Sequence, residues 1–86
     1  MHVWVLEIFD REDKWCEYDS ETVAVYSKSK FNEARSHFKR LCDSRIDDGD
    51  EISRWKSDNG YHFSCNNGSC SNYRFSYVGL KRMELL

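Results

Sequence analysis

The sequence is defined first by what it lacks. It has no proline, no internal repeat and no low-complexity linker in its 86 residues. No apolar run approaches membrane-spanning length, so we expect no transmembrane helix. The opening segment MHVWVLEIFDRED has no basic leader, and Glu7 interrupts its apolar residues, so we expect no secretory signal. These absences predict one soluble domain, residues 1–86, in the cytoplasm.

Motifs for catalysis are also missing. The chain has no Gly-rich phosphate loop and no P-loop lysine. Its three histidines, His2, His37 and His62, are scattered. A Cys–His pair can be drawn from His62 and Cys65, but nothing marks an oxyanion hole or an orienting acid. We therefore expect a protein that is not an enzyme and that carries no cofactor.

Aromatic and charged residues are abundant. Three Trp, five Tyr and five Phe stand in a chain that is 33% charged. Such a composition predicts a thin core, with much of it aromatic, under a well-solvated surface. The charges are segregated: residues 28–45 carry six Lys and Arg against two acids, whereas residues 1–27 and 46–60 are acidic.

Hydrophobic patterns predict the order β–β–α–β–β. Residues 3–10 (VWVLEIFD) are apolar on both faces, which is typical of a central strand. A second strand within residues 15–27 is strongest at 22–26, and aromatic strands are expected at 61–65 and 71–85. Residues 52–55 are either a short strand or a turn. The elements predict an α+β domain, with an antiparallel sheet of about four strands and one amphipathic helix on one face.

The predicted helix follows residue 27 and fades by Arg45. Ser27 or Ser29 is expected to cap its first turn. The apolar residues recur at helical period, which predicts a single core-facing stripe. This stripe consists of Phe31, Ala34, Phe38, Leu41 and Cys42.

Residues 61–75 (YHFSCNNGSCSNYRF) allow two hairpin registers. A two-residue turn at Asn67-Gly68 would place Cys65 opposite Cys70, close enough for a disulfide. A shift of one residue would instead pair Phe63 with Tyr73 and Tyr61 with Phe75, so that the aromatic side chains share one face. A shift of one residue moves all apolar side chains of a strand to the other face of the sheet, so burial should decide the register. We therefore favour the aromatic register, or a bulge that is compatible with both the turn and the aromatic pairing.

A zinc site is the alternative for the same segment. His62, Cys65 and Cys70 have the spacing H-x2-C-x4-C, with Cys42 or Cys16 as a fourth ligand. Successive strand residues alternate between faces, however, so His62 and Cys65 meet only if the strand bends. We therefore predict no metal site, and we expect Cys42 to be a core residue.

Two binding surfaces remain. The first is acidic with aromatic anchors, a composition typical of an interface hot spot. We predict that it binds a partner protein through Glu12, Asp13, Trp15, Glu17, Tyr18, Asp19, Asp47, Asp48, Asp50, Glu51 and Trp55. The alternative is a nucleic-acid interface on the basic helix. It would use Lys28, Lys30, Arg35, Lys39, Arg40 and Arg45. In one version of this alternative, the zinc site described above would stabilise the domain.

The segments VWVLEIFD, VAVYSKSKFNEA and YRFSYVGLKRMEL also carry a resemblance. Together they resemble small phage and bacterial accessory proteins, which open with a V-Y/W-V-L strand and join a strand directly to a helix. The resemblance implies an accessory protein of a phage or mobile element. Such proteins often occlude a site on a host protein, as anti-CRISPR and other anti-defence proteins do. A host protein is then the expected partner, and homodimerisation through the aromatic sheet is compatible with this role.

Overall fold

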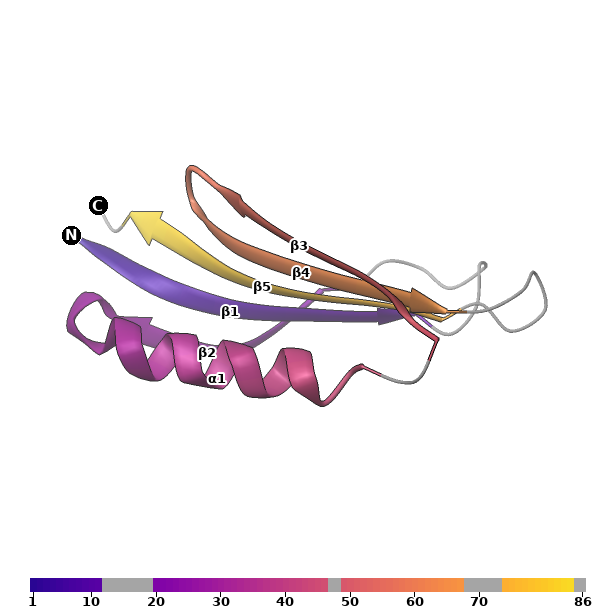
Figure 1. The fold of residues 1–86 in the computed structure, drawn as a ribbon. Helices are drawn as coiled ribbons and strands as arrows, with labels where there is room; N and C mark the ends of the chain where they lie inside the picture. Colours follow the sequence, from indigo (N-terminus) through magenta and orange to yellow (C-terminus); the bar gives the residue numbers. More distant parts are fainter. Residues whose placement is uncertain (12–19, 47–48, 68–73, 85–86) are drawn as a thin grey trace.

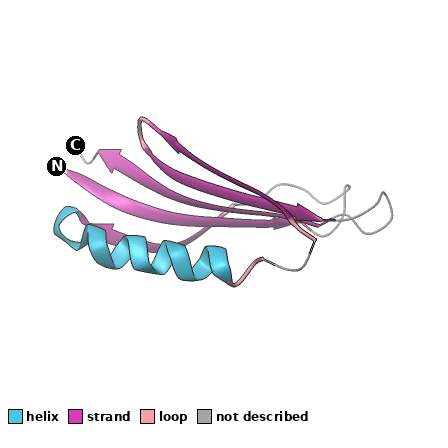
Figure 2. Cartoon of the chain, in the orientation of Figure 1, coloured by secondary structure: helices cyan, strands magenta, loops and turns pink. Residues whose placement is uncertain are grey.

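The computed structural model describes residues 1–11, 20–46, 49–67 and 74–84. Within these residues the chain forms β1 (His2–Arg11), β2 (Glu21–Ser27), a short 3-10 turn η1 (Lys28–Lys30), α1 (Phe31–Asp43), β3 (Glu51–Ser57), β4 (Gly60–Asn67) and β5 (Arg74–Glu84). Every strand pair is antiparallel, in the order β2-β1-β5-β4-β3. The helix runs along one side of the sheet (Figures 1 and 2).

The predicted α+β class with an antiparallel sheet and a helix is confirmed. The expected strand number is wrong, since the described residues contain five strands and not about four. The difference lies at residues 51–57, which form β3 at one edge of the sheet. The short segment 52–55 looked ambiguous because its residues are mostly exposed, so no buried face marks it as a strand.

The core lies between the sheet and the apolar stripe of α1. Ala34 and Cys42 of the helix belong to one buried cluster with Leu6, Phe63 and Leu80 of the strands. Val78 and Cys65 complete this cluster, and Phe31, Phe38 and Leu41 pack against it. We call the sheet face that carries these strand residues the helix-side face. The other face, which carries residues such as Val25, Trp55 and Tyr77, is called the open face.

The hairpin registers expected for residues 61–75 are both wrong. Phe63 pairs with Val78 and Tyr61 with Leu80, while Cys65 lies opposite Ser76 and Asn67 opposite Arg74. Asn67 is thus a strand residue, and Tyr73 and Cys70 lie outside the described residues. Phe75 and Tyr77 consequently lie on the open face, opposite to Tyr61 and Phe63. The core selects Val78 and Leu80, both fully buried, because aromatic rings from the helix already occupy much of its space.

Polar chemistry supports this register as well. The Tyr77 hydroxyl, which would lack a partner in the apolar core, hydrogen-bonds to His62 on the open face.

The start of the helix also differs from expectation. The cap residue of α1 is Lys30, and neither Ser27 nor Ser29 caps it; their hydroxyl groups lie 3.2 Å apart and hydrogen-bond to each other. The turn η1 takes up the residues that would otherwise hold the cap.

Candidate functional site

A rigid aromatic cluster lies on the open face where β3, β4 and β5 adjoin. Trp55 pairs across the strands with His62, and their rings stack at a centroid distance of 5.3 Å and an interplanar angle of 16°. Tyr77 extends the stack, with its ring centroid 6.1 Å from that of His62. Although its ring is held in this way, Trp55 remains 46% exposed. The cluster therefore presents a large, preorganised aromatic side chain to solvent.

Hydrogen bonds fix the imidazole at the centre of this cluster. Ser57 Oγ donates to Asn59 Oδ1 over 2.7 Å, so its lone pair is left to accept from His62 Nε2–H, also at 2.7 Å. His62 Nδ1 then accepts from the Tyr77 hydroxyl at 2.8 Å. This chain of donors requires the neutral imidazole with its proton on Nε2. It links residues of three strands and the β3–β4 turn into one polar network.

Burial favours the neutral forms of both His62 and Tyr77 in this network. Desolvation, with a smaller contribution from the Lys81 ammonium, lowers the pKa of His62 below its ordinary value. Desolvation also raises the pKa of the Tyr77 hydroxyl. Lys81 is paired with Glu7 at 2.9 Å, and this hydrogen bond raises the pKa of the lysine. The neutral forms of His62 and Tyr77 are therefore favoured, as the hydrogen bonds require.

Gly79 makes room for the Tyr77 ring. It lies opposite His62 on the neighbouring strand, and it is buried under the tyrosine. A Cβ atom at this position would overlap the Tyr77 hydroxyl. The absence of a side chain at residue 79 thus lets the ring lean across β5 and reach His62.

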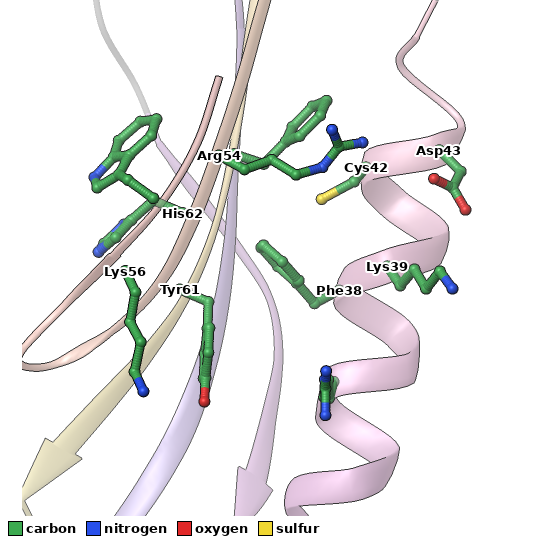
Figure 3. Close-up of a pocket in the computed structure, with 11 residues that line it drawn as sticks. Phe38, Lys39, Cys42, Asp43, Arg54, Lys56, Tyr61 and His62 are labelled. Atoms are coloured by element: carbon green, nitrogen blue, oxygen red, sulfur yellow. The ribbon is translucent and has the colours of Figure 1, made fainter. Parts of the chain in front are cut away.

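A groove lies on the helix-side face of the same strands. It has a volume of about 520 Å³ between α1 and the β3–β4 hairpin. Figure 3 shows Arg54 projecting from the strands toward Cys42 of the helix, while His62 projects from the other side of the sheet. Tyr61 and Phe38 also line the groove. The groove exists because the helix covers the sheet only partly toward β3.

Positive charge predominates in this groove. Arg35 and Lys39 of α1 and Arg54 and Lys56 of β3 line it, against the single carboxylate of Asp43. Arg54 lies over the Phe63 ring at 5.4 Å, and Lys56 lies over the Tyr61 ring at 5.5 Å. Aromatic faces position these two cations without neutralising them.

The groove also contains the thiol of Cys42. This side chain is 4% exposed, and burial raises its pKa to about 12. The thiol is therefore protonated at neutral pH and is a poor nucleophile. Its place in the apolar stripe of the helix agrees with the predicted role as a small core residue.

The acidic partner surface predicted from the sequence is only partly described. Glu12, Asp13, Trp15, Glu17, Tyr18, Asp19, Asp47 and Asp48 lie outside the described residues. Glu51 and Trp55 are exposed on β3, and Asp50 directly precedes them at intermediate exposure. The described part of the predicted surface therefore lies at the edge strand.

The six basic residues of the predicted nucleic-acid surface differ in their surroundings. Arg35 and Lys39 line the groove. Lys30 pairs with Glu33 at 3.4 Å, and Arg45 binds the Asp10 carboxylate through two hydrogen bonds of 3.1 Å. Lys28 and Arg40 are exposed and do not line the groove. Two of the six are thus engaged in ion pairs, while β3 supplies two further cations to the groove.

The residues of the alternative zinc site are separated by the sheet. His62 lies on the open face, whereas Cys65 is 1% exposed in the core and donates its thiol proton to the Arg45 carbonyl at 3.3 Å. Cys70 and Cys16 lie outside the described residues. Among the residues that are described, no three His, Cys, Asp or Glu side chains come together in a way that could hold a metal ion.

Sequence reasoning missed Arg54, Lys56 and Tyr61 as groove residues and the link between Ser57, His62 and Tyr77. The usable signal was the alternation in ISRWKS, which places residues 54 and 56 on one face and 55 and 57 on the other. That signal becomes informative only once β3 is known to be a strand paired with β4.

In the described residues, no helix is long and apolar enough to cross a membrane. No protein-family model, curated protein or solved structure matches this chain.

Proposed function

We propose that this protein is a non-enzymatic protein-binding module whose contact surface is the open face around Trp55. The observation that carries the proposal is the 46% exposure of a tryptophan whose ring is fixed by stacking on His62. A fixed aromatic ring loses little conformational entropy on binding, which is why Trp and Tyr dominate interface hot spots. Val25 and Met83, 60% and 51% exposed on the same face, add further apolar contact area.

Acidic side chains at the two ends of β3 support a basic partner surface. Glu51 begins the same strand, and Asp58 lies exposed in the turn that follows it. Charge of one sign beside an aromatic anchor steers a partner of the opposite sign and fixes its orientation.

The resemblance noted in the sequence supports a narrower form of this proposal. In that form the protein is a phage or mobile-element inhibitor, and it occludes a basic surface on a host nucleic-acid enzyme or a CRISPR-type defence complex. The direction of the hydrogen bond between Ser57 and His62 supports a binding role over catalysis. Because the Ser57 hydroxyl donates to Asn59, the imidazole nitrogen facing it is a donor and not a base.

The test replaces Trp55 with the photocrosslinking residue benzoylphenylalanine and identifies host proteins that become covalently attached on irradiation. Each attached protein is then purified, and its affinity for the wild type and for Trp55→Ala is measured by calorimetry. We expect Trp55→Ala to weaken binding by at least about thirtyfold, as for a hot-spot residue. Reversal of charge by Glu51→Lys with Asp58→Lys should also weaken binding, mainly through the association rate.

The matched control reverses two acids away from this edge, Glu33→Lys with Glu84→Lys. Affinities that are equal for the wild type and Trp55→Ala, or equal losses in the two charge-reversed variants, would contradict the proposed surface. Crosslinking of the protein only to itself, together with a dimer mass in solution, would instead assign the open face to homodimerisation.

A further inference from the structure

The groove on the helix-side face is a second site, distinct from the open face. We propose that it binds single-stranded nucleic acid, with phosphates on the cations of β3 and α1 and with a base against Tyr61. The inference does not depend on the proposed function, because Arg54 and Lys56 alternate with Trp55 along β3 and project from the opposite face of the sheet, although Trp55 and His62 also line the groove.

The first argument is the unneutralised charge of the groove. Within the described residues, none of Arg35, Lys39, Arg54 and Lys56 forms an ion pair with a carboxylate, whereas Lys30, Arg45 and Lys81 each do. The protein as a whole has a net charge of −2, so the concentration of cations here is a local feature. Cations held between a helix and a strand without internal partners fit a polyanion.

The second argument is the combination of cations with aromatic rings. Tyr61 and Phe38 are partly exposed in the groove, and Lys56 lies over the Tyr61 ring. Proteins that bind single strands combine a basic track with rings on which bases stack. An acidic peptide would satisfy the cations but would offer no flat partner to the rings. A duplex would hide its bases from a recessed ring, so the combination favours an unpaired strand.

The third argument is the continuation of the groove. A smaller hollow of about 160 Å³ shares Lys56 and Tyr61 with it and adds Arg82 and Trp4 to the lining. Basic and aromatic residues thus line a path that is longer than a single pocket, with Asp58 as the one carboxylate in the smaller hollow. Such a path suits an extended chain of nucleotides better than a mononucleotide.

The experiment measures the fluorescence anisotropy of a labelled oligo-dT of about fifteen nucleotides, a length within the site size of known single-strand binders. We expect Arg54→Gln with Lys56→Gln to weaken binding by at least tenfold at about 0.1 M salt. The slope of log K against log salt should also become shallower by about 1.4, because two phosphate contacts are lost. Tyr61→Leu should weaken binding, and Tyr61→Phe, which retains the ring, should not.

The matched control is Lys28→Gln with Arg40→Gln, which removes the same charge from exposed positions outside the groove and should change binding less than twofold. Thermal melting confirms that each variant is folded. The proposal is overturned if oligo-dT does not bind, if both double variants lose affinity equally, or if duplex DNA competes as well as oligo-dT. Equal competition by polyglutamate would overturn it in favour of an acidic peptide.

Discussion

His62 links pH to stability through its hydrogen bonds. The folded protein needs the neutral imidazole, and burial together with Lys81 lowers the pKa of His62 below its ordinary value near 6.5. At a pH between the folded and unfolded pKa values the unfolded chain binds the extra proton. The stabilising contribution is therefore complete above about pH 6.5, and it is lost as the pH falls toward the folded pKa.

We accordingly expect the free energy of unfolding of the wild type to fall between pH 7 and pH 5 more steeply than that of His62→Gln. Urea denaturation across this range measures both curves, and NMR of the imidazole nitrogens reports the pKa and the tautomer directly. Parallel stability curves for the two proteins, or a His62 pKa at or above its ordinary value, would contradict the assigned hydrogen-bond chain.

Two glycines provide a sharper test of packing at single residues. In Gly79→Ala the new methyl group displaces the Tyr77 ring and breaks its hydrogen bond to His62, at a cost of about 1–2 kcal/mol. In Gly60→Ala the methyl group overlaps the Leu80 carbonyl, which is backbone and cannot rotate away. We expect the second substitution to cost more, about 3 kcal/mol.

Urea unfolding of both variants measures these costs. The control for Gly79→Ala is the same substitution made in a Tyr77→Ala background. Without the ring, Gly79→Ala should be nearly neutral, and the cycle of four proteins isolates the coupling between the two positions. An undiminished cost of Gly79→Ala in that background would show that the glycine is required for another reason.

At the scale of elements, one ion pair joins the end of α1 to β1. Arg45 donates two hydrogen bonds to Asp10, and its side chain also contacts the Leu41 carbonyl at the end of the helix. The backbone carbonyl of the same residue accepts the Cys65 thiol. A single residue thus connects the helix with strands β1 and β4 on either side of β5.

We expect Asp10→Asn to lower the free energy of unfolding by about 1 kcal/mol, because the pair is bidentate and the arginine side chain is only 16% exposed. The control is Glu33→Gln, which removes the exposed partner of Lys30 and should cost less than about 0.5 kcal/mol. Chemical denaturation at low and high salt compares them. Equal costs for the two variants would show that Arg45 does not connect these elements.

The elements also show how far sequence reasoning extends. Strand β1 was predictable because its apolar residues form a nearly continuous run, and the apolar stripe of α1 was predictable because it follows one period over several residues. The pairing of β4 with β5 was not, because two alternating sets of apolar residues, Tyr73, Phe75 and Tyr77 against Val78 and Leu80, competed for the core. Local alternation gives the faces of a strand but not which face is buried.

At the scale of the whole molecule, β3 serves two surfaces. Its alternate residues project to opposite faces of the sheet, with Trp55 on one and Arg54 and Lys56 on the other. Neither site was predictable in full, because each joins residues that are far apart in sequence, as Ser57 and Tyr77 or Arg35 and Arg54 are. The exposed Trp55 was identified from composition alone, since an aromatic residue among polar neighbours is already unusual.

The pairing of β1 with β5 also bears on how the chain is made. Residues 2–11 are synthesised before their partner, which begins only at Arg74. At 5–20 residues per second, synthesis of the intervening chain takes roughly 3 to 13 seconds. During that interval β1 can pair only with β2, so its other edge is open to chaperones and to neighbouring nascent chains. Slowing translation should therefore increase aggregation of this protein more than it would for one assembled from neighbouring hairpins.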